Sequence, residues 1–294
     1  MDLSAVRLAV DAGDRLGECA LWCEQAQAFW WTDIEGSKIC RLQADGSVRD
    51  WQLPERVGSF AFCAGSASRL LLGLASGIAV FDTADASLSA VTPVEADQPA
   101  TRINDGRCDR QGRFVFGMYN PKEEGIGGIY RVHADLRVER LALPAAAVAN
   151  SICFSPDGAT MYYADSPTRT IWSLAYGADG RIGTPRVFVQ LGADEGYPDG
   201  SCIDAEGSLW NAQWEGRCVV RYDRDGRPTE RIALPVSRPT CPAFGGPALD
   251  TLYVTSARGG LARERLREEP HAGGVFAATT RWHGLPESRF VLAR

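Results

Sequence analysis

The stretch Ala28-Phe29-Trp30-Trp31-Thr32-Asp33 is a short run of aromatic and β-branched residues that leads into a turn at Glu35-Gly36. A second run, residues 38–42, follows this turn, and after the pair Asp45-Gly46 the chain continues into a third run, residues 48–53. An Asp-Gly pair between two such runs is a strong signal for a β-hairpin. This stretch therefore predicts an antiparallel sheet of short strands.

The same pattern recurs along the rest of the chain. The strand-like runs that open each repeat are spaced 41, 44, 47, 48 and 43 residues apart, and they begin near Phe29, Leu70, Phe114, Met161, Leu209 and Leu252. A period of about 40 to 50 residues with several strands in each unit is typical of β-propellers, whose units are called blades. The repeats therefore predict an all-β fold, a six-bladed β-propeller.

The repeats follow one another without a low-complexity linker, so we expect residues 1–294 to form a single domain. A ring of sheets must close on itself, and two strand-like segments, residues 5–10 and 288–292, lie outside the six repeats. We expect these N- and C-terminal strands to share one blade and so to close the ring.

Composition and charge restrict the class of partner. The net charge of -6 gives no basic surface for nucleic acid or for an anionic membrane, and no apolar run approaches the roughly 18 residues of a membrane helix. The N-terminus lacks a basic start followed by an apolar core, and most of the nine cysteines lie in apolar runs, as in reducing compartments. We therefore expect a cytoplasmic monomer that acts on a small molecule.

Four polar side chains lie just before or at the start of an apolar run: Glu18, Asn104, Asn150 and Asp199. Asp199 belongs to Tyr197-Pro198-Asp199-Gly200-Ser201, where proline and glycine indicate a turn, so we expect it at the mouth of a strand rather than inside one. The innermost strands of a propeller run along its central channel, so these four side chains are predicted to converge at the channel mouth. Their spacing alone also fits solvated loop residues or side chains that cap turns.

Carboxylates and carboxamides are hard oxygen donors, which suit Ca²⁺, Mg²⁺ or Mn²⁺, and also Zn²⁺ or Fe²⁺ if nitrogen or water completes the shell. A metal with few protein ligands keeps open positions, where a substrate carbonyl can be polarised. Arg102 would add a forked donor beside the mouth, unless it forms a salt bridge at the surface. Histidine-based catalysis is disfavoured, because none of His133, His271 and His283 accompanies a nucleophile motif.

Four motifs in the same order resemble the regucalcin (senescence marker protein)/gluconolactonase family of six-bladed propellers, in particular its bacterial sugar lactonases. The resemblance spans nearly the whole chain. The motifs are Leu16-Gly17-Glu18, Arg102-Ile103-Asn104-Asp105-Gly106, Asn150-Ser151-Ile152-Cys153-Phe154, and Tyr197-Pro198-Asp199-Gly200-Ser201.

The family consists largely of metal-dependent sugar lactonases and includes a calcium-associated animal member. Carried over by motif, the resemblance implies that Glu18, Asn150 and Asp199 are ligands of one divalent metal ion, whose identity (Ca, Zn, Mn, Mg or Fe(II)) stays open. It also implies that Arg102 and Asn104 contact the substrate.

The chain departs from the usual family pattern after Phe116-Gly117, where Met118-Tyr119-Asn120 replaces Gly-Thr-Met. A residue between 119 and 124 is therefore expected to contact substrate, and Asn120 is the residue that we predict.

These observations predict a hydrolase that opens an aldonolactone, of the gluconolactone, xylonolactone, arabinonolactone or galactonolactone type, to the aldonic acid. Asp199, or a water that it orients, is the predicted catalytic base. An alternative is a non-catalytic calcium-binding regulatory propeller of the regucalcin type, and a third is another ester or phosphoester hydrolase on the same scaffold.

Overall fold

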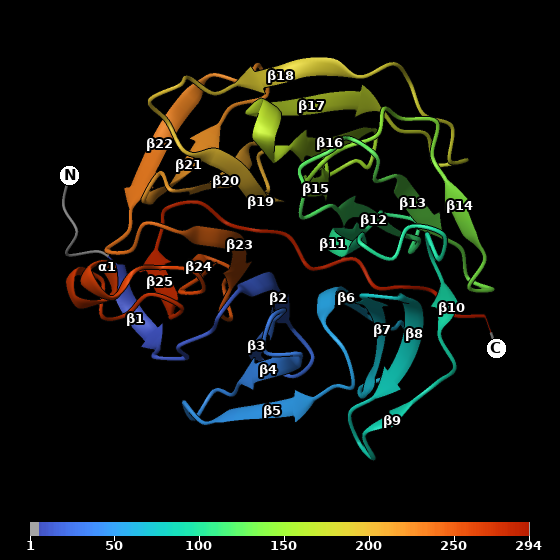
Figure 1. Cartoon of the computed structure of the whole chain (residues 1–294), viewed down its shortest axis with the longest axis horizontal. Helices are drawn as coiled ribbons and strands as arrows, with labels where there is room; N and C mark the ends of the chain where they lie inside the picture. The colour runs from blue at the N-terminus through green and yellow to red at the C-terminus, as the bar shows by residue number, and fades with distance from the viewer. Residues whose placement is uncertain (1–5, 294) are drawn as a thin grey trace.

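The computed structural model describes residues 6–293, whose strands form six antiparallel sheets arranged in a ring (Figure 1). This arrangement confirms the predicted all-β six-bladed propeller. The runs that define the sequence repeat are the second strands of the blades, counted outward from the axis. Each of these strands pairs with an inner strand that lines the centre of the ring.

The first half of the ring contains blades one to three, in which the strands follow one another from the channel outward. Blade one contains β2 (Gly17–Cys23), β3 (Ala28–Asp33), β4 (Lys38–Leu42) and β5 (Val48–Gln52). Blade two contains β6 (Val57–Phe62), β7 (Arg69–Leu74), β8 (Gly77–Asp82) and the short β9 (Ser87–Leu88) and β10 (Thr92–Pro93). Blade three contains β11 (Arg102–Cys108), β12 (Phe114–Tyr119), β13 (Ile129–Val132) and β14 (Val138–Arg140).

The second half of the ring has the same plan. Blade four contains β15 (Ala149–Phe154), β16 (Thr160–Asp165), β17 (Thr170–Ala175) and β18 (Arg186–Gln190), with a 3-10 turn at Ser166–Thr168. Blade five contains β19 (Tyr197–Ile203), β20 (Leu209–Trp214), β21 (Cys218–Tyr222) and β22 (Pro228–Ala233). Blade six contains β23 (Pro239–Gly245), β24 (Thr251–Ser256), β25 (Val275–Thr279) and β1 (Val6–Val10).

The ring closes differently at the two ends of the chain. β1 pairs antiparallel with β25 and completes blade six, and residue 5 of the predicted strand lies outside the described residues. Residues 288–292 do not join this blade, because β1 already occupies the outer edge of β25. Instead, the Phe290 amide donates to the Phe62 carbonyl and the Val291 amide to the Gly112 carbonyl, in blades two and three.

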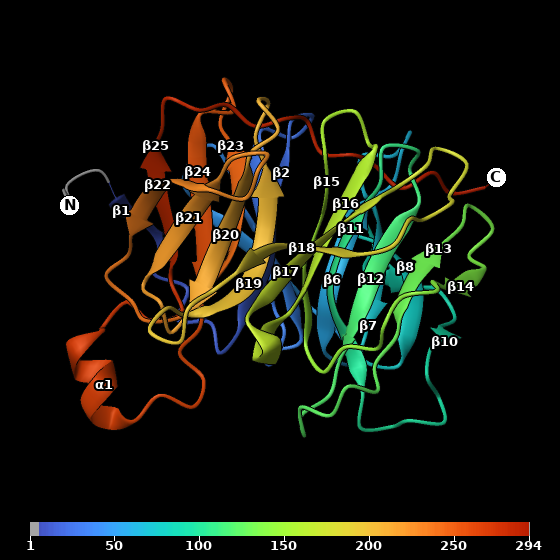
Figure 2. The same ribbon diagram turned by 90° about the horizontal axis from the view of Figure 1, so that it is seen from above.

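The segment before Phe290 crosses one face of the ring, opposite the face that carries the short helix α1 (Arg263–Glu268) (Figure 2). On its way the Ala205 amide donates to the His283 carbonyl, and Glu287 forms an ion pair with Arg107 of the inner strand β11. The cavity beneath it measures about 30 Å³, enough for one or two waters and too small for a sugar.

α1 is held to the other face by Glu269, which follows it. The Glu269 carboxylate accepts hydrogen bonds from the Ser237 amide at 2.7 Å, from Arg217 at 2.6 Å and from Arg265 at 2.9 Å. Burial raises the pKa of Glu269, but these donors outweigh it and lower the pKa to about 2. Within residues 6–293, no helix is long and apolar enough to cross a membrane.

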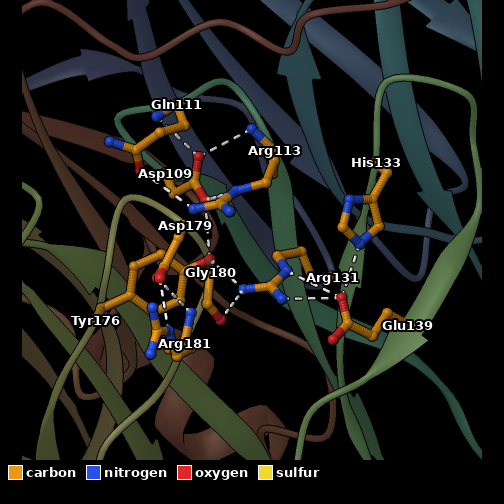
Figure 3. A network of polar contacts seen from close by, with 10 residues as sticks. All are labelled: Asp109, Gln111, Arg113, Arg131, His133, Glu139, Tyr176, Asp179, Gly180 and Arg181. Atoms are coloured by element: carbon orange, nitrogen blue, oxygen red, sulfur yellow. Dashed lines mark hydrogen bonds and ion pairs between the residues drawn. The ribbon is translucent and has the colours of Figure 1, made fainter.

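A polar network fastens blade three to blade four (Figure 3). The Tyr176 hydroxyl donates to Asp109 at 2.8 Å and accepts from Arg131 at 3.1 Å, and Arg131 also donates to the Gly180 carbonyl at 2.8 Å. Glu139 accepts from Arg131 at 2.9 Å and lies 2.7 Å from the ring nitrogen of His133. Because Tyr176 is fully buried, this network resists relative movement of the two blades.

Candidate functional site

The inner strands of blades one and four are irregular near their first residues. The pairing of β2 shifts directly after Glu18, and that of β15 shifts directly after Asn150. The next residues, Cys19 and Ser151, have left-handed φ angles of 48° and 57°. Such β-bulges turn the strand and redirect its side chains, and a left-handed non-glycine residue costs about 1 to 3 kcal/mol. The backbone conformation that orients Glu18 and Asn150 therefore lowers the stability of the fold.

Asn104 and Asp199 lie inside the corresponding bulges of β11 and β19. The expectation that Asp199 lies at the mouth of a strand is wrong, because Asp199 is the third residue of β19. Pro198 and Gly200 do mark an interruption of the strand pairing, but that interruption is a bulge and not a turn. Proline is tolerated within a sheet at such a position.

These side chains line one pocket of about 470 Å³ at the mouth of the channel. Blade one supplies Glu18, blade three Arg102 and Asn104, blade four Asn150, and blade five Asp199. The predicted convergence of four residues that are far apart in sequence is therefore present. The pocket is also lined by Leu16, Glu35, Tyr119, Glu123, Val148, Ser166, Pro167, Tyr197 and Trp214.

Two carboxyl groups meet at the base of this pocket. The carboxyl groups of Glu18 and Asp199 lie close enough to shift each other's pKa, and their residues are only 8% and 5% exposed. Burial, followed by repulsion from Asp105, raises the pKa of Glu18 to about 8. Burial and repulsion from Glu18 raise the pKa of Asp199 well above its ordinary value. The pair therefore favours protonation, or a cation that compensates its charge.

The carboxamides and the arginine form a chain of hydrogen bonds beside this pair. Arg102 donates to the Asn104 side-chain oxygen at 2.7 Å, and the Asn104 amide donates to the Asn150 side-chain oxygen at 3.0 Å. Asn150 in turn donates to the Ser166 hydroxyl at 2.9 Å. This chain orients the Asn150 oxygen toward Asn104, and a carboxamide oxygen has a second lone pair for another partner.

The residues fit a divalent cation. Within residues 6–293, no three His, Cys, Asp or Glu side chains form a metal-binding cluster, so a metal in this pocket would take two carboxylates and a carboxamide. These are hard oxygen donors, suited to Ca²⁺, Mg²⁺ or Mn²⁺. Burial and repulsion from Asp105 outweigh the favourable charge of Arg102 at Glu18, so a bound cation would be needed to keep this carboxyl group ionised at neutral pH.

Asn120 does not line the pocket. Its side chain accepts a hydrogen bond from the Lys122 amide at 3.0 Å and donates to the Glu124 carbonyl at 3.2 Å, so it caps its own loop. Its neighbours Tyr119 and Glu123 line the pocket instead. β12 ends at Tyr119, so Asn120 is the first residue of the following loop, where its side chain satisfies local backbone groups.

Sequence reasoning also missed Asp105 and the aromatic lining. Asp105 is buried beside the carboxyl pair, accepts a hydrogen bond from the Ile152 amide at 2.7 Å, and has a pKa raised by burial. The position of Asp105 directly after Asn104 could have indicated a site residue, but an Asp-Gly pair is also typical of a hairpin turn. Tyr197 and Trp214 gave no signal, since aromatic residues at strand ends are common in any propeller.

The fold and the pocket define a class of protein: a six-bladed propeller with buried carboxyl and carboxamide groups gathered at one mouth of its channel. The chain belongs to the SMP-30/gluconolactonase/LRE-like family, whose model matches residues 16–258.

Relatives with assigned names match almost the full length. L-arabinolactonase of Azospirillum brasilense is 48% identical over 291 residues, covering 97% of this chain and 95% of that protein. A 6-deoxy-6-sulfogluconolactonase of Pseudomonas putida is 36% identical over 282 residues, covering 94% and 95%. Among solved structures, regucalcin of Agrobacterium tumefaciens, described as a calcium-binding protein, superposes with a TM-score of 0.92 at 33% identity and covers 97% of each chain.

Proposed function

We propose that this protein is a sugar lactonase, which hydrolyses the cyclic ester of an aldonolactone to the open aldonic acid. The observation that carries this proposal is the pocket at the channel mouth, where the carboxyl pair lies beside a line of hydrogen-bond donors. The names of the two relatives, both lactonases of sugar acids, support the same reaction.

The proposed metal ligands are Glu18, Asn150 and Asp199, which project into the pocket from three different blades. A divalent cation bound there would polarise the lactone carbonyl and lower the pKa of a coordinated water. The physiological metal is left to measurement, because this donor set suits several hard cations.

Arg102 and Asn104 are proposed to position the hydroxyl groups of the sugar. Arg102 is almost fully buried, its Nη1 atom is occupied by Ile103 and Asn104, and its charge is retained although burial lowers its pKa to about 10. The Nη2 atom is therefore the part of the guanidinium that is proposed to bind a ligand oxygen. Glu123 and Tyr119, which line the pocket, are proposed as substrate contacts in place of Asn120.

Asp199 is proposed as the base. Hydrolysis requires that water loses a proton as it attacks the lactone carbonyl and that the ring oxygen gains one as the ester bond breaks. A bound cation would keep the Asp199 carboxylate ionised, so Asp199 would accept this proton or orient a metal-bound water that supplies the base. Orientation of the water by Arg102, Asn104 and the carboxyl groups would supply the remaining positioning.

The substrate is proposed to be a lactone of a five- or six-carbon aldonic acid, with an arabinonolactone as the first compound to test. The 48% identity to L-arabinolactonase supports this order. Lactones of the gluconolactone, xylonolactone and galactonolactone types complete the panel.

The test follows acid release from this panel with a pH indicator, in the presence of Ca²⁺, Mg²⁺, Mn²⁺ or Zn²⁺ and again after EDTA treatment. We expect metal-dependent acceleration over spontaneous ring opening and its loss in Asp199→Ala. Asp225→Ala is the matched control, because Asp225 is 69% exposed at a hairpin turn. Normal hydrolysis by Asp199→Ala would exclude the assigned role of this residue.

A second candidate is a calcium-binding propeller without catalytic activity, which the similarity to the Agrobacterium protein favours. Calcium binding by calorimetry, combined with no acceleration on any lactone with any of the four metals, would select this candidate.

We also propose that the protein acts as a monomer in a reducing compartment such as the cytoplasm. All nine cysteines are buried and free, as in proteins of reducing compartments. Light scattering would test the first statement, and localisation of a tagged protein would test the second.

A further inference from the structure

Three aromatic side chains line the pocket, and each has an arginine stacked on its ring. The Arg102 guanidinium lies 4.3 Å from the centre of the Tyr119 ring, and Arg169 lies 4.0 Å from that of Tyr197. Arg238 lies 4.7 Å from the ring of Trp214. Such cation–π contacts stabilise one orientation of each ring.

Tyr197 and Trp214 are direct partners across β19 and β20, at the pocket end of blade five. The same register position holds Gly17 opposite Asp33 in blade one, and Ala149 opposite Asp165 in blade four. The aromatic pair is therefore particular to blade five, and its strand β19 also carries Asp199. We call Tyr197 and Trp214 the aromatic platform.

Trp214 is held from behind by a series of charged contacts that begins at α1. Arg265 of α1 donates to Glu215 at 3.1 Å, and Glu215 accepts from Arg238 at 2.5 Å. Arg238 also donates to the Gly259 carbonyl at 2.7 Å, which fixes the guanidinium that stacks on Trp214. This support occupies one side of the indole and leaves the ring as part of the pocket wall.

Tyr197 is supported in a similar way. The Nη1 atom of Arg169 donates to the carbonyls of Gly192, Glu195 and Gly196, in the loop that leads into β19. Both members of the aromatic platform are therefore held by arginines that are themselves anchored to backbone carbonyls. Preorganised groups of this kind lose little entropy when a ligand binds.

We infer that the aromatic platform binds the carbon face of the sugar lactone, that Trp214 determines which lactones are accepted, and that Arg238 is a positioning residue for Trp214. This inference rests on the proposed lactonase function. A sugar lactone has polar edges and a face of C–H groups, and a pocket with Arg102 and Asn104 on one wall and aromatic rings on another complements both.

The expected consequence is a change in binding rather than in the chemical step. The platform is assigned no proton transfer, so its loss should remove interactions that substrate and transition state share. Loss of contacts to one carbon changes discrimination about 10- to 200-fold. The ratio of kcat/KM between a pentonolactone and a hexonolactone should therefore change in Trp214→Ala, because the two differ by one carbon in the side arm.

The experiment compares wild type, Trp214→Ala, Trp214→Phe and Arg238→Met on pentono- and hexonolactones. In Trp214→Ala we expect KM to rise about tenfold or more, with kcat within about threefold of wild type. Trp214→Phe should restore most of the affinity because it keeps an aromatic face, and Arg238→Met should raise KM by a smaller factor.

Arg49→Met is the matched control, since Arg49 stacks at 4.5 Å on Trp51 in the outer part of blade one and should leave KM unchanged. Thermal unfolding of each variant separates loss of folding from loss of binding. If Trp214→Ala fails to fold, the KM values of Trp214→Phe and Arg238→Met still show whether the Trp214 ring contributes to substrate binding.

A binding measurement separates this inference from the proposed function. Calorimetry with a cyclic sugar ether, which lacks the lactone carbonyl, tests the platform without turnover. Binding that weakens in Trp214→Ala, without hydrolysis by wild type, would support the platform and reject the lactonase function. Hydrolysis by wild type with unchanged KM, substrate ratio and ether binding in Trp214→Ala would reject the platform alone. Absence of both binding and hydrolysis in wild type would reject both.

Discussion

Binding of a divalent cation at the channel mouth should depend steeply on pH. In the cation-free protein the pKa of Glu18 is raised to about 8, first by burial and then by Asp105. Metal ligands bind in their deprotonated form, so a cation must displace this proton at any pH below 8. Each pH unit below 8 should weaken the apparent affinity about tenfold, or about 1.4 kcal/mol, which predicts about a hundredfold loss between pH 8 and pH 6.

The assay is calorimetric titration with Mn²⁺ or Ca²⁺ at pH 6, 7 and 8, in buffers with different ionisation enthalpies. The buffer dependence of the observed heat reports the number of protons released, which we expect to be about one or more at pH 7. Glu18→Gln should release about one proton fewer, while Asp225→Ala should behave like wild type. A dissociation constant that stays within threefold from pH 6 to pH 8, without proton release, would refute the reasoning.

The same carboxyl pair should make the fold less stable as pH rises, whereas a salt-bridged carboxylate makes a fold more stable as pH rises. A carboxyl whose pKa is raised in the folded state stabilises the fold at low pH, and this contribution is lost as pH rises from the ordinary value of 4.5 through 8. Unfolding in EDTA should therefore show a contribution from this pair that falls between pH 5 and pH 8. Added metal should restore stability most strongly at the alkaline end.

Three further predictions concern the scaffold. Tyr176→Phe should lower the free energy of unfolding by about 1 to 3 kcal/mol in urea denaturation, because it leaves Asp109 and Arg131 without their hydrogen bonds to the hydroxyl group. The exposed control Arg181→Ala should change the free energy of unfolding by less than about 0.5 kcal/mol. Glu269, whose pKa is lowered to about 2, should stabilise the fold above pH 4.5 and lose that contribution as pH falls toward 2. Glu269→Gln should lower the free energy of unfolding by about 1 to 3 kcal/mol at pH 7 and should reduce the loss of stability between pH 4.5 and pH 2. An unchanged loss of stability over this pH range would contradict the assignment. Gly117→Ala should lower the free energy of unfolding by about 1 to 3 kcal/mol, since its new Cβ would lie 2.2 Å from the Ala149 Cβ. Adding Ala149→Gly should recover most of this loss. A double variant that is no more stable than Gly117→Ala would argue against this clash.

Local patterns predicted the blades because their physics is local. Alternating apolar runs and Asp-Gly turns specify hairpins, and a period near 45 residues specifies how many blades there are. The position of the C-terminal segment was not predictable in this way. Whether residues 288–292 join an outer edge or cross the ring depends on which edge β1 has already taken.

Prediction of the site was uneven for a related reason. Glu18, Asn104, Asn150 and Asp199 could be proposed together because every blade places the start of its inner strand at the same end of the channel. Asn120 does not line the pocket, because it follows the end of β12 and its side chain bonds to the backbone of its own loop, which residue type alone does not reveal.

The sequence by itself determined the repeat, the all-β class and the identity of the oxygen donors, since these depend on residue type and spacing along the chain. Only the tertiary structure decided that Asp199 lies in a bulge within β19, that its carboxyl group is buried beside that of Glu18, and that Trp214 is supported from α1. These features arise from contacts between blades, where burial and neighbouring charges set the pKa values and where residues distant in sequence share one pocket.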